Sequence, residues 1–159
     1  HQKYAVDFRS LRYPGVISSA AMPGGGTTDY AVEIYHDALR KGTYKCFLDK
    51  GTMLPMMYMP DLLAATVGMM EAPESKLTQR IYNIGSMSFS PEDVEESIQK
   101  VLPDFTMEYH ADFRQAIAET WPKRLDDTMA RKDWGWNPQY DLDSMTRDML
   151  SVLKANMDR

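Results

Sequence analysis

The sequence contains a single cysteine, Cys46, in 159 residues. One thiol excludes an intrachain disulfide framework, and so little cysteine fits a reducing compartment. No apolar run approaches the roughly 18 residues that a membrane-spanning helix needs, so we expect no membrane partner. The net charge of −5 provides no basic surplus, which argues against nucleic acid as a partner. The first four residues have neither a signal-peptide nor a transit-peptide pattern.

Groups suited to metal binding or covalent chemistry are also scarce. The three histidines, His1, His36 and His110, are scattered, and none has a partner at metal-ligand spacing, so we expect no metal site. Cys46 lies in a predicted strand, where a cysteine is more often a packing residue than a nucleophile. The sequence has neither a Gly-x-Gly-x-x-Gly motif after a strand nor a Walker loop. These observations identify no reaction, and we assign no catalytic residue within the chain.

What the chain does contain is the composition of an ordinary globular domain, with 43% hydrophobic and 26% charged residues. At this length we expect one unit with a sizeable core. Strands are predicted at residues 6–13, 43–48, 54–59, 80–84 and 105–109, and we expect the first to be a buried, parallel strand. Helices are predicted at residues 28–41, 60–71, 90–102, 113–120 and 125–132, with a last helix that begins at Asp141. Asp61 is the expected N-cap of the second helix, and Ser90, followed by proline and acidic residues, is the expected cap of the third. The alternation of strands and helices indicates the α/β class.

The most distinctive stretch is Pro23–Ala31, which reads Pro-Gly-Gly-Gly-Thr-Thr-Asp-Tyr-Ala. Three consecutive glycines permit unusual backbone dihedrals and leave no side chain in the way of a ligand. Thr27 or Thr28 can cap the helix that follows, and Asp29 suits the positive end of its dipole. Free N–H groups at that helix start could then hold a carboxylate or a phosphate. A connecting loop followed by a capped helix explains the same residues, so both interpretations stay open.

Six parts of the chain carry a recognisable pattern. They are Leu11–Ser18, Pro23–Ala31, Leu54–Asp61, Tyr82–Ile84 with Met87–Phe89, Ala118–Pro122, and Asp126–Trp136. Together they resemble the NAD-dependent L-threonine 3-dehydrogenases, which belong to the extended short-chain dehydrogenase/reductase superfamily. The resemblance runs from about Tyr4 to Met149, and the glycine-rich stretch combined with the Asp-Trp-Gly-Trp segment makes it specific.

The resemblance implies that the chain is the C-terminal half of such an enzyme. Its fold would be the C-terminal part of a Rossmann-type doubly wound sheet plus a small α/β substrate domain. Residues 1–45, with scattered later segments, would complete the nucleotide-binding sheet, and residues 46–159 would form mainly the substrate-binding and C-terminal region. The family's glycine fingerprint and its catalytic Tyr-x-x-x-Lys, whose helix would end at residues 1–4, are absent from the sequence. We therefore expect the 159 residues alone to be inactive.

The resemblance also implies which residues bind the cofactor and the substrate. The loop that lines the nicotinamide of NAD maps onto Pro14, Gly15, Val16 and Ile17, with Val16 the strongest candidate. The amino-acid end of the substrate, L-threonine, maps near Gly24, Thr28 and Asp29. The missing tyrosine would act as the base in hydride transfer to NAD, and this half would position the substrate.

The three tryptophans have different expected roles. Trp121 resembles a tryptophan that walls the substrate pocket, but a core aromatic is an equally good interpretation. For Trp134 and Trp136 we expect packing at a helix end.

Two other functions stay open at this point. The chain could be a non-catalytic fragment or ligand-binding module, as the missing motifs suggest. It could also be part of a nucleotide-sugar epimerase or reductase of the same superfamily, although such a site usually neutralises a diphosphate with arginine and residues 54–59 are uncharged. By resemblance the complete enzyme would be a homodimer, in the mitochondrial matrix of a eukaryote or the cytoplasm of a bacterium.

Overall fold

The computed structural model of the chain describes residues 3–157. The strands are β1 (Ser10–Arg12), β2 (Gly15–Ile17), β3 (Thr43–Cys46), β4 (Leu54–Tyr58), β5 (Ile81–Asn83), β6 (Met87–Phe89) and β7 (Thr106–Tyr109). The helices are α1 (Tyr30–Lys41), α2 (Met59–Glu71), a 3-10 turn (Glu74–Lys76), α3 (Pro91–Gln99), α4 (Phe113–Glu119), α5 (Thr128–Trp134) and α6 (Leu142–Met157). The helix end expected at residues 1–4 falls partly on His1 and Gln2, which lie outside the described residues. Lys3 and Tyr4 lie in a turn.

Small sheets, mostly parallel, connect these elements. β1 pairs in parallel with β5, and β3 pairs in parallel with β7. In the third sheet β4 lies between its parallel partner β2 and its antiparallel partner β6. Parallel pairs whose strands are separated by helices confirm the predicted α/β class.

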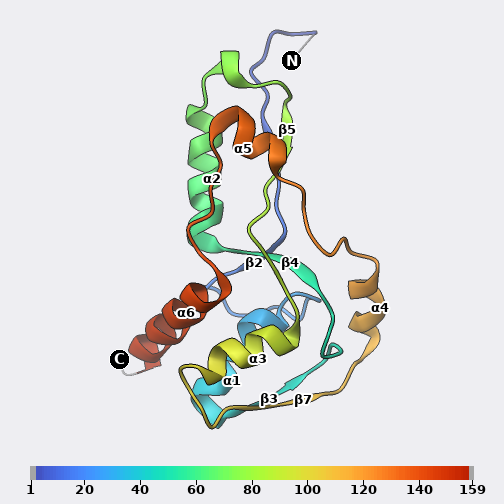
Figure 1. Cartoon of the computed structure of the whole chain (residues 1–159), viewed down its shortest axis with the longest axis vertical. Helices are drawn as coiled ribbons and strands as arrows, with labels where there is room; N and C mark the ends of the chain where they lie inside the picture. The colour runs from blue at the N-terminus through green and yellow to red at the C-terminus, as the bar shows by residue number, and fades with distance from the viewer. Residues whose placement is uncertain (1–2, 158–159) are drawn as a thin grey trace.

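The molecule has two lobes, and β4 lies where they meet (Figure 1). The upper lobe in that view contains α2, α5 and β5, and the lower lobe contains α1, α3, β3 and β7. Met56 and Tyr58 pack in the larger core of the lower lobe, whereas Met57 packs in the smaller core of the upper lobe. Successive side chains of a strand point to opposite faces, so β4 contributes to both cores and is buried along its whole length.

The two cores do not separate at residue 45. Tyr35 and Tyr44, which precede that boundary, pack in the larger core with Leu54, which follows it. The smaller core combines Tyr82 with Trp136. The predicted division of the chain between nucleotide and substrate binding therefore does not follow the packing, and it stays a prediction about the complete enzyme.

The first predicted strand, residues 6–13, is shorter and less buried than expected. β1 covers only Ser10–Arg12, and the side chains of Val6 and Phe8 are 58% and 50% exposed. Pro14 has no N–H to donate to the ladder, and the chain passes from β1 into β2 at this residue. The parallel pairing of this segment was predicted correctly, but the expected burial was wrong.

The helix starts show which local signals are reliable. α3 begins with the predicted capping box, in which the Ser90 hydroxyl accepts from the Asp93 N–H and the Asp93 carboxylate accepts from the Ser90 N–H. Asp61 was predicted to cap α2, but it lies inside the helix and is 1% exposed. Its carboxylate accepts the N–H groups of Gln139 and Tyr140 at 2.9 and 3.2 Å. Asp61 therefore joins α2 to the segment before α6, a contact that no local pattern reveals.

Other buried side chains agree with their predicted packing roles. Cys46 is fully buried, and this burial raises the pKa of its thiol to about 11. Trp134 and Trp136 pack at the end of α5, where the Trp136 indole N–H donates to the carbonyl of Gly85 at 2.8 Å. The ring of Trp134 meets Tyr82 edge-on.

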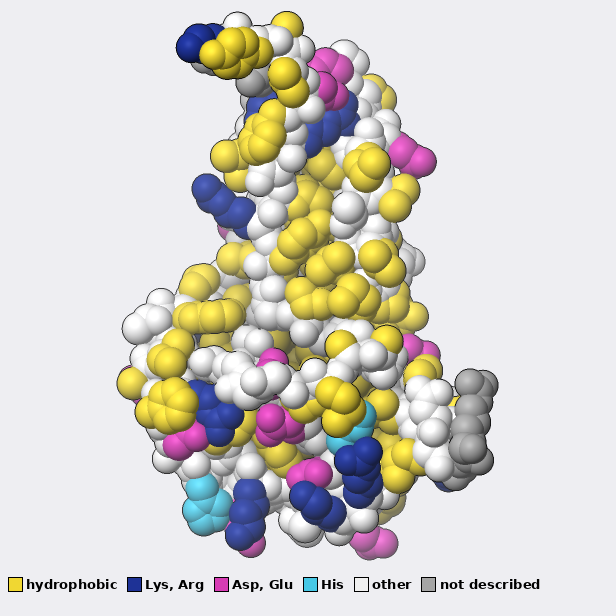
Figure 2. All heavy atoms as spheres, turned by 180° about the vertical axis from the view of Figure 1, so that it is seen from behind, with side chains coloured by type: hydrophobic (Ala, Val, Ile, Leu, Met, Phe, Trp, Pro, Cys, Tyr) yellow, Lys and Arg dark blue, Asp and Glu magenta, His cyan; other side chains and the backbone are white. Residues whose placement is uncertain are grey.

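One face of the upper lobe is apolar and exposed. Figure 2 shows hydrophobic side chains gathered on this lobe when the molecule is seen from behind. On α2, Leu63, Val67 and Met70 are 57%, 52% and 73% exposed, and their spacing places them on one side of the helix. Ile81 of β5 is also exposed. Parallel sheets are normally covered on both faces. An exposed apolar surface beside such a sheet is therefore typical of a protein–protein contact.

Candidate functional site

The glycine loop, residues 23–29, is organised by the carboxylate of Asp29. Oδ2 of Asp29 accepts the N–H groups of Gly24 and Gly26 at 2.7 and 2.9 Å. Between them, Gly25 has a φ of +90°, a conformation that residues with a Cβ rarely adopt. The other carboxylate oxygen of Asp29, Oδ1, has no hydrogen-bond partner among residues 3–157. Asp29 therefore fixes the loop with one oxygen and keeps the other available.

The start of α1 offers fewer free N–H groups than the sequence suggested. α1 begins two residues later than predicted. The Ala31 N–H donates to the carbonyl of Thr28, and the N–H groups of Val32 and Glu33 donate to the carbonyl of Asp29. No threonine side chain caps the helix. A turn at residues 27–29 precedes α1, so the backbone satisfies the amides of residues 31–33, and the anion site at this helix start stays a prediction.

Gly15 and Thr28, predicted to face the cofactor and the substrate respectively, lie against each other. A Cβ built on Gly15 would lie 2.6 Å from Sδ of Met56 and 2.8 Å from Cγ2 of Thr28. Gly15 is buried between these side chains. The Thr28 methyl group packs here, while its hydroxyl forms no hydrogen bond with any residue of the described range. The contact places a predicted cofactor residue beside a predicted substrate residue.

The other predicted cofactor residues lie where the chain leaves β1. β1 and β5 run parallel, so their carboxyl ends share one edge, which is where ligands of open α/β sheets bind. Pro14 and Val16 are half-buried and keep some exposed surface there. Ile17 is fully buried in the larger core, which leaves only its backbone to contact a ligand.

Arg114 of α4, which the sequence analysis missed, connects that helix to the glycine loop. Its guanidinium carbon lies 3.1 Å from the centre of the Phe47 ring, and its Nη1 donates to the carbonyl of Gly25 at 3.4 Å. The Asp112 carboxylate accepts from the same guanidinium at 2.7 Å. The arginine and the glycine are 89 residues apart, so only the folded chain reveals their pairing.

Trp121 lies just after α4, on the wall of a cavity of about 320 Å³. Thr52, Gln115 and Lys123 line the same cavity, and Oε1 of Gln115 accepts from the Thr52 hydroxyl at 3.0 Å. Trp121 is 38% exposed, so its side chain is not a core aromatic. This burial favours the pocket-wall interpretation over the packing one.

The predicted residues therefore fall into two neighbouring groups. Gly24 pairs with Asp29, and Gly15 contacts Thr28, so these four lie in and beside the glycine loop. Trp121 lies on its own cavity, and α4 connects that cavity to the loop because Arg114 belongs to the same helix.

Residues 3–157 contain no group of three or more histidine, cysteine, aspartate or glutamate side chains that could hold a metal ion. In the same range no helix is both long and apolar enough to cross a bilayer.

Comparison with known proteins places this geometry in context. No protein-family model matches the chain. The crystal structure of L-threonine dehydrogenase from Phytophthora infestans has 61% sequence identity and a TM-score of 0.96, covering 98% of this chain and 50% of that one. Mitochondrial L-threonine 3-dehydrogenase from Sus scrofa is 49% identical over 157 residues, which are 98% of this chain and 42% of that protein. An uncharacterized epimerase/dehydratase from Staphylococcus aureus is 50% identical over 155 residues, which are 96% of this chain and 48% of that protein.

The chain thus has the fold of part of a dehydrogenase of the short-chain dehydrogenase/reductase type. In sequence and structure it is similar to L-threonine 3-dehydrogenases, as the resemblance predicted. It spans about half the length of the relatives that it matches.

The exposure of Trp121 leads to a prediction about stability. We expect Trp121→Ala to lower the free energy of unfolding by only about 1 kcal/mol, because a partly exposed side chain leaves little cavity. Trp136→Ala is the matched control: Trp136 is 5% exposed, and truncation of a core aromatic costs about 3–5 kcal/mol. Urea unfolding of both variants measures the difference. An equal loss in the two would mean that Trp121 is a packing residue.

Proposed function

We propose that the chain is the C-terminal, substrate-positioning half of an NAD-dependent L-threonine 3-dehydrogenase, which oxidises L-threonine to 2-amino-3-oxobutanoate. The observation that carries this proposal is the glycine loop, in which Asp29 is held by two glycine amides and Thr28 packs on Gly15. The similarity to L-threonine dehydrogenases over 98% of the chain supports it.

The exposed apolar face of the upper lobe supports the assignment to one half of an enzyme. Leu63, Val67 and Met70 leave a stripe of α2 exposed, beside a sheet of only two described strands. A nucleotide-binding half packed on this face would extend the sheet beyond β1 and bury the stripe. By resemblance the complete enzyme is a homodimer, and it works in the mitochondrial matrix of a eukaryote or the cytoplasm of a bacterium. The Sus scrofa relative is named as mitochondrial.

The residues present fit a nicotinamide ring. Pro14 and Val16 keep apolar surface at the shared carboxyl edge of β1 and β5, and Gly15 brings no side chain between them. Bound NAD would supply a hydride acceptor. On this chain, Pro14, Gly15 and Val16 would orient the ring by apolar and backbone contact.

The substrate would be held by the glycine loop. Oδ1 of Asp29 is a free acceptor on a negatively charged group, which suits the ammonium of an amino acid. The free hydroxyl of Thr28 could donate to the substrate carboxylate. With both ends held, the Cβ that carries the hydroxyl would be oriented toward the nicotinamide, and such orientation accounts for much of the rate enhancement in bimolecular reactions.

The apolar character of β4 does not distinguish a small substrate from a nucleotide sugar. Leu54–Tyr58 are all buried in the two cores, so their lack of charge reflects packing rather than a ligand. A nucleotide-sugar epimerase or reductase and a non-catalytic module therefore remain the alternatives, and the second experiment below separates them from the dehydrogenase.

The first experiment concerns the missing motifs. We expect the purified 159-residue chain to form no NADH from L-threonine and NAD, because the sequence has no Tyr-x-x-x-Lys to accept the hydroxyl proton. Absorbance at the NADH band measures the rate, and a full-length L-threonine 3-dehydrogenase serves as the positive control. Turnover above the protein-free blank by a mass-verified chain would contradict the assignment to a positioning half.

The second experiment tests Thr28 in a full-length enzyme that contains this half. Thr28→Val keeps the methyl that packs on Gly15 and removes the hydroxyl, whereas Thr28→Ser keeps the hydroxyl. A lost hydrogen bond to a charged ligand costs about 1.5–3 kcal/mol. We therefore expect Thr28→Val to raise the KM for L-threonine at least about tenfold with near-normal NAD affinity, and Thr28→Ser to behave like the unmodified enzyme. Normal threonine kinetics in Thr28→Val would show that the residue only packs.

A further inference from the structure

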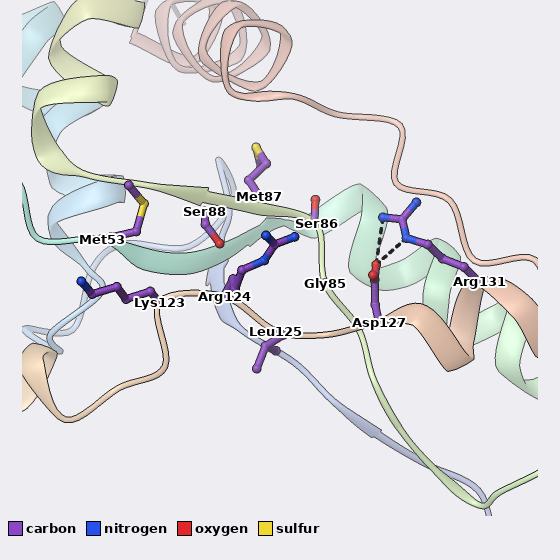
Figure 3. Close-up of a pocket in the computed structure, with 10 residues that line it drawn as sticks. All are labelled: Met53, Gly85, Ser86, Met87, Ser88, Lys123, Arg124, Leu125, Asp127 and Arg131. Carbon is purple, nitrogen blue, oxygen red and sulfur yellow. Dashed lines mark hydrogen bonds and ion pairs between the residues drawn. The ribbon is translucent and has the colours of Figure 1, made fainter.

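Another cavity, of about 450 Å³, lies between β6 and the linker that joins α4 to α5. Figure 3 shows its walls, with residues 85–88 on one side and residues 123–125, Asp127 and Arg131 on the other. The cavity shares Met53 and Lys123 with the cavity of Trp121. Its lining comes from segments that are far apart in the sequence, so sequence analysis gave no indication of it.

The backbone around this cavity is arranged to leave it open and polar. β6 pairs with β4 along one edge, and its other edge has no strand partner among residues 3–157. A Cβ at Gly85 would lie 2.9 Å from the carbonyl oxygen of Leu125, so the linker approaches this closely only because residue 85 is glycine. The hydroxyl groups of Ser86 and Ser88 add hydrogen-bonding groups to the same wall.

The side chains that line the cavity carry more positive than negative charge. Of its three cationic side chains, Arg131 is paired with Asp127 at 2.8 Å. Lys123 and Arg124 form no hydrogen bond or ion pair with any of the described residues. Asp126, beside them in sequence, directs its carboxylate to Thr128 instead. Two cations therefore reach the cavity without an ion-pair partner among residues 3–157. The charge of Arg124 still acts on Asp126, whose pKa is lowered first by its hydrogen bonds from Thr128 and to a smaller extent by Arg124.

The orientation of Arg124 makes it the central group. Figure 3 shows its guanidinium extending from the linker toward β6, where Ser86 and Ser88 lie. A planar guanidinium presents paired N–H donors that match the oxygens of a phosphate or a carboxylate. A concave wall concentrates the field of such charges and so strengthens their attraction for an anion.

We propose that this cavity binds a small anion through a phosphate or carboxylate group, with Arg124 as the main ligand and Lys123 as the second. The site goes beyond the proposed oxidation of L-threonine, because none of the cavity's residues belongs to the glycine loop or to the predicted cofactor residues, although it shares Met53 and Lys123 with the cavity of Trp121. Its binding can be measured without NAD, so a failure here is distinguishable from a failure of the dehydrogenase proposal.

Calorimetric titration of the purified protein with inorganic phosphate tests the site. We expect saturable binding that weakens as the salt concentration rises, as for exposed charges. Arg124→Gln should weaken binding about tenfold or more, and Lys123→Gln about threefold or more, since each removes a charge from the cavity. Arg124→Lys keeps the charge but loses the planar fork, so its effect should be intermediate.

The matched control is Lys132→Gln, which removes an exposed charge from α5 that does not line the cavity. Its phosphate affinity should stay within about twofold of the unmodified protein, and thermal melts should show that every variant is folded. The proposal is overturned if phosphate does not bind saturably, or if Lys132→Gln weakens binding as much as Arg124→Gln does. The second result would mean diffuse attraction to surface charge.

Acetate and L-threonine, each titrated in competition with phosphate, identify the chemistry of the ligand. Displacement of phosphate by both would assign the site to carboxylates, the amino-acid substrate included. Displacement by neither, with phosphate binding intact and dependent on Arg124, would assign it to a phosphate-bearing ligand.

Discussion

The glycine loop depends on one charged side chain that accepts two backbone amides. Without Oδ2 of Asp29, the N–H groups of Gly24 and Gly26 would have no acceptor, and a loop of three glycines would populate many conformations. The same carboxylate leaves Oδ1 free beside Thr28, whose methyl packs on Gly15. A single aspartate thus fixes the loop, and the neighbouring Thr28 joins it to Gly15 at the start of β2.

The two lobes depend on β4 in a comparable way. Because its side chains alternate between two cores, the strand cannot shift by one residue without exchanging Met56 with Met57. This fixed register positions Met56 against Gly15 through the β2–β4 pairing. Packing in the core therefore sets the place of the loop, and Arg114 secures the loop from the other side through the carbonyl of Gly25.

Much of the fold could be predicted from the sequence because it rests on local signals. The Ser90 capping box and the strand at residues 54–58 follow from composition within a few residues. What failed depends on which partners a side chain finds in the folded chain. Asp61 looks like a helix cap but bonds to residues 139 and 140, and Asp29 looks like a helix-start acid but bonds back to its own loop. Of the candidate site, the motif residues could be proposed from the sequence and their ligand roles stay predictions, whereas Arg114 and the cavity beside Arg124 arise only from tertiary folding.

The claim that Asp29 holds both the loop and the substrate can be measured directly in a full-length, NAD-loaded enzyme that contains this half. Asp29→Asn keeps an oxygen that can accept the glycine amides but removes the charge that would meet the ammonium of threonine. The measurement compares the Kd of L-threonine with that of 3-hydroxybutyrate, which lacks the ammonium. The account predicts that the substitution weakens threonine binding at least about tenfold and leaves 3-hydroxybutyrate binding nearly unchanged. Equal affinity for threonine in the two proteins would contradict it.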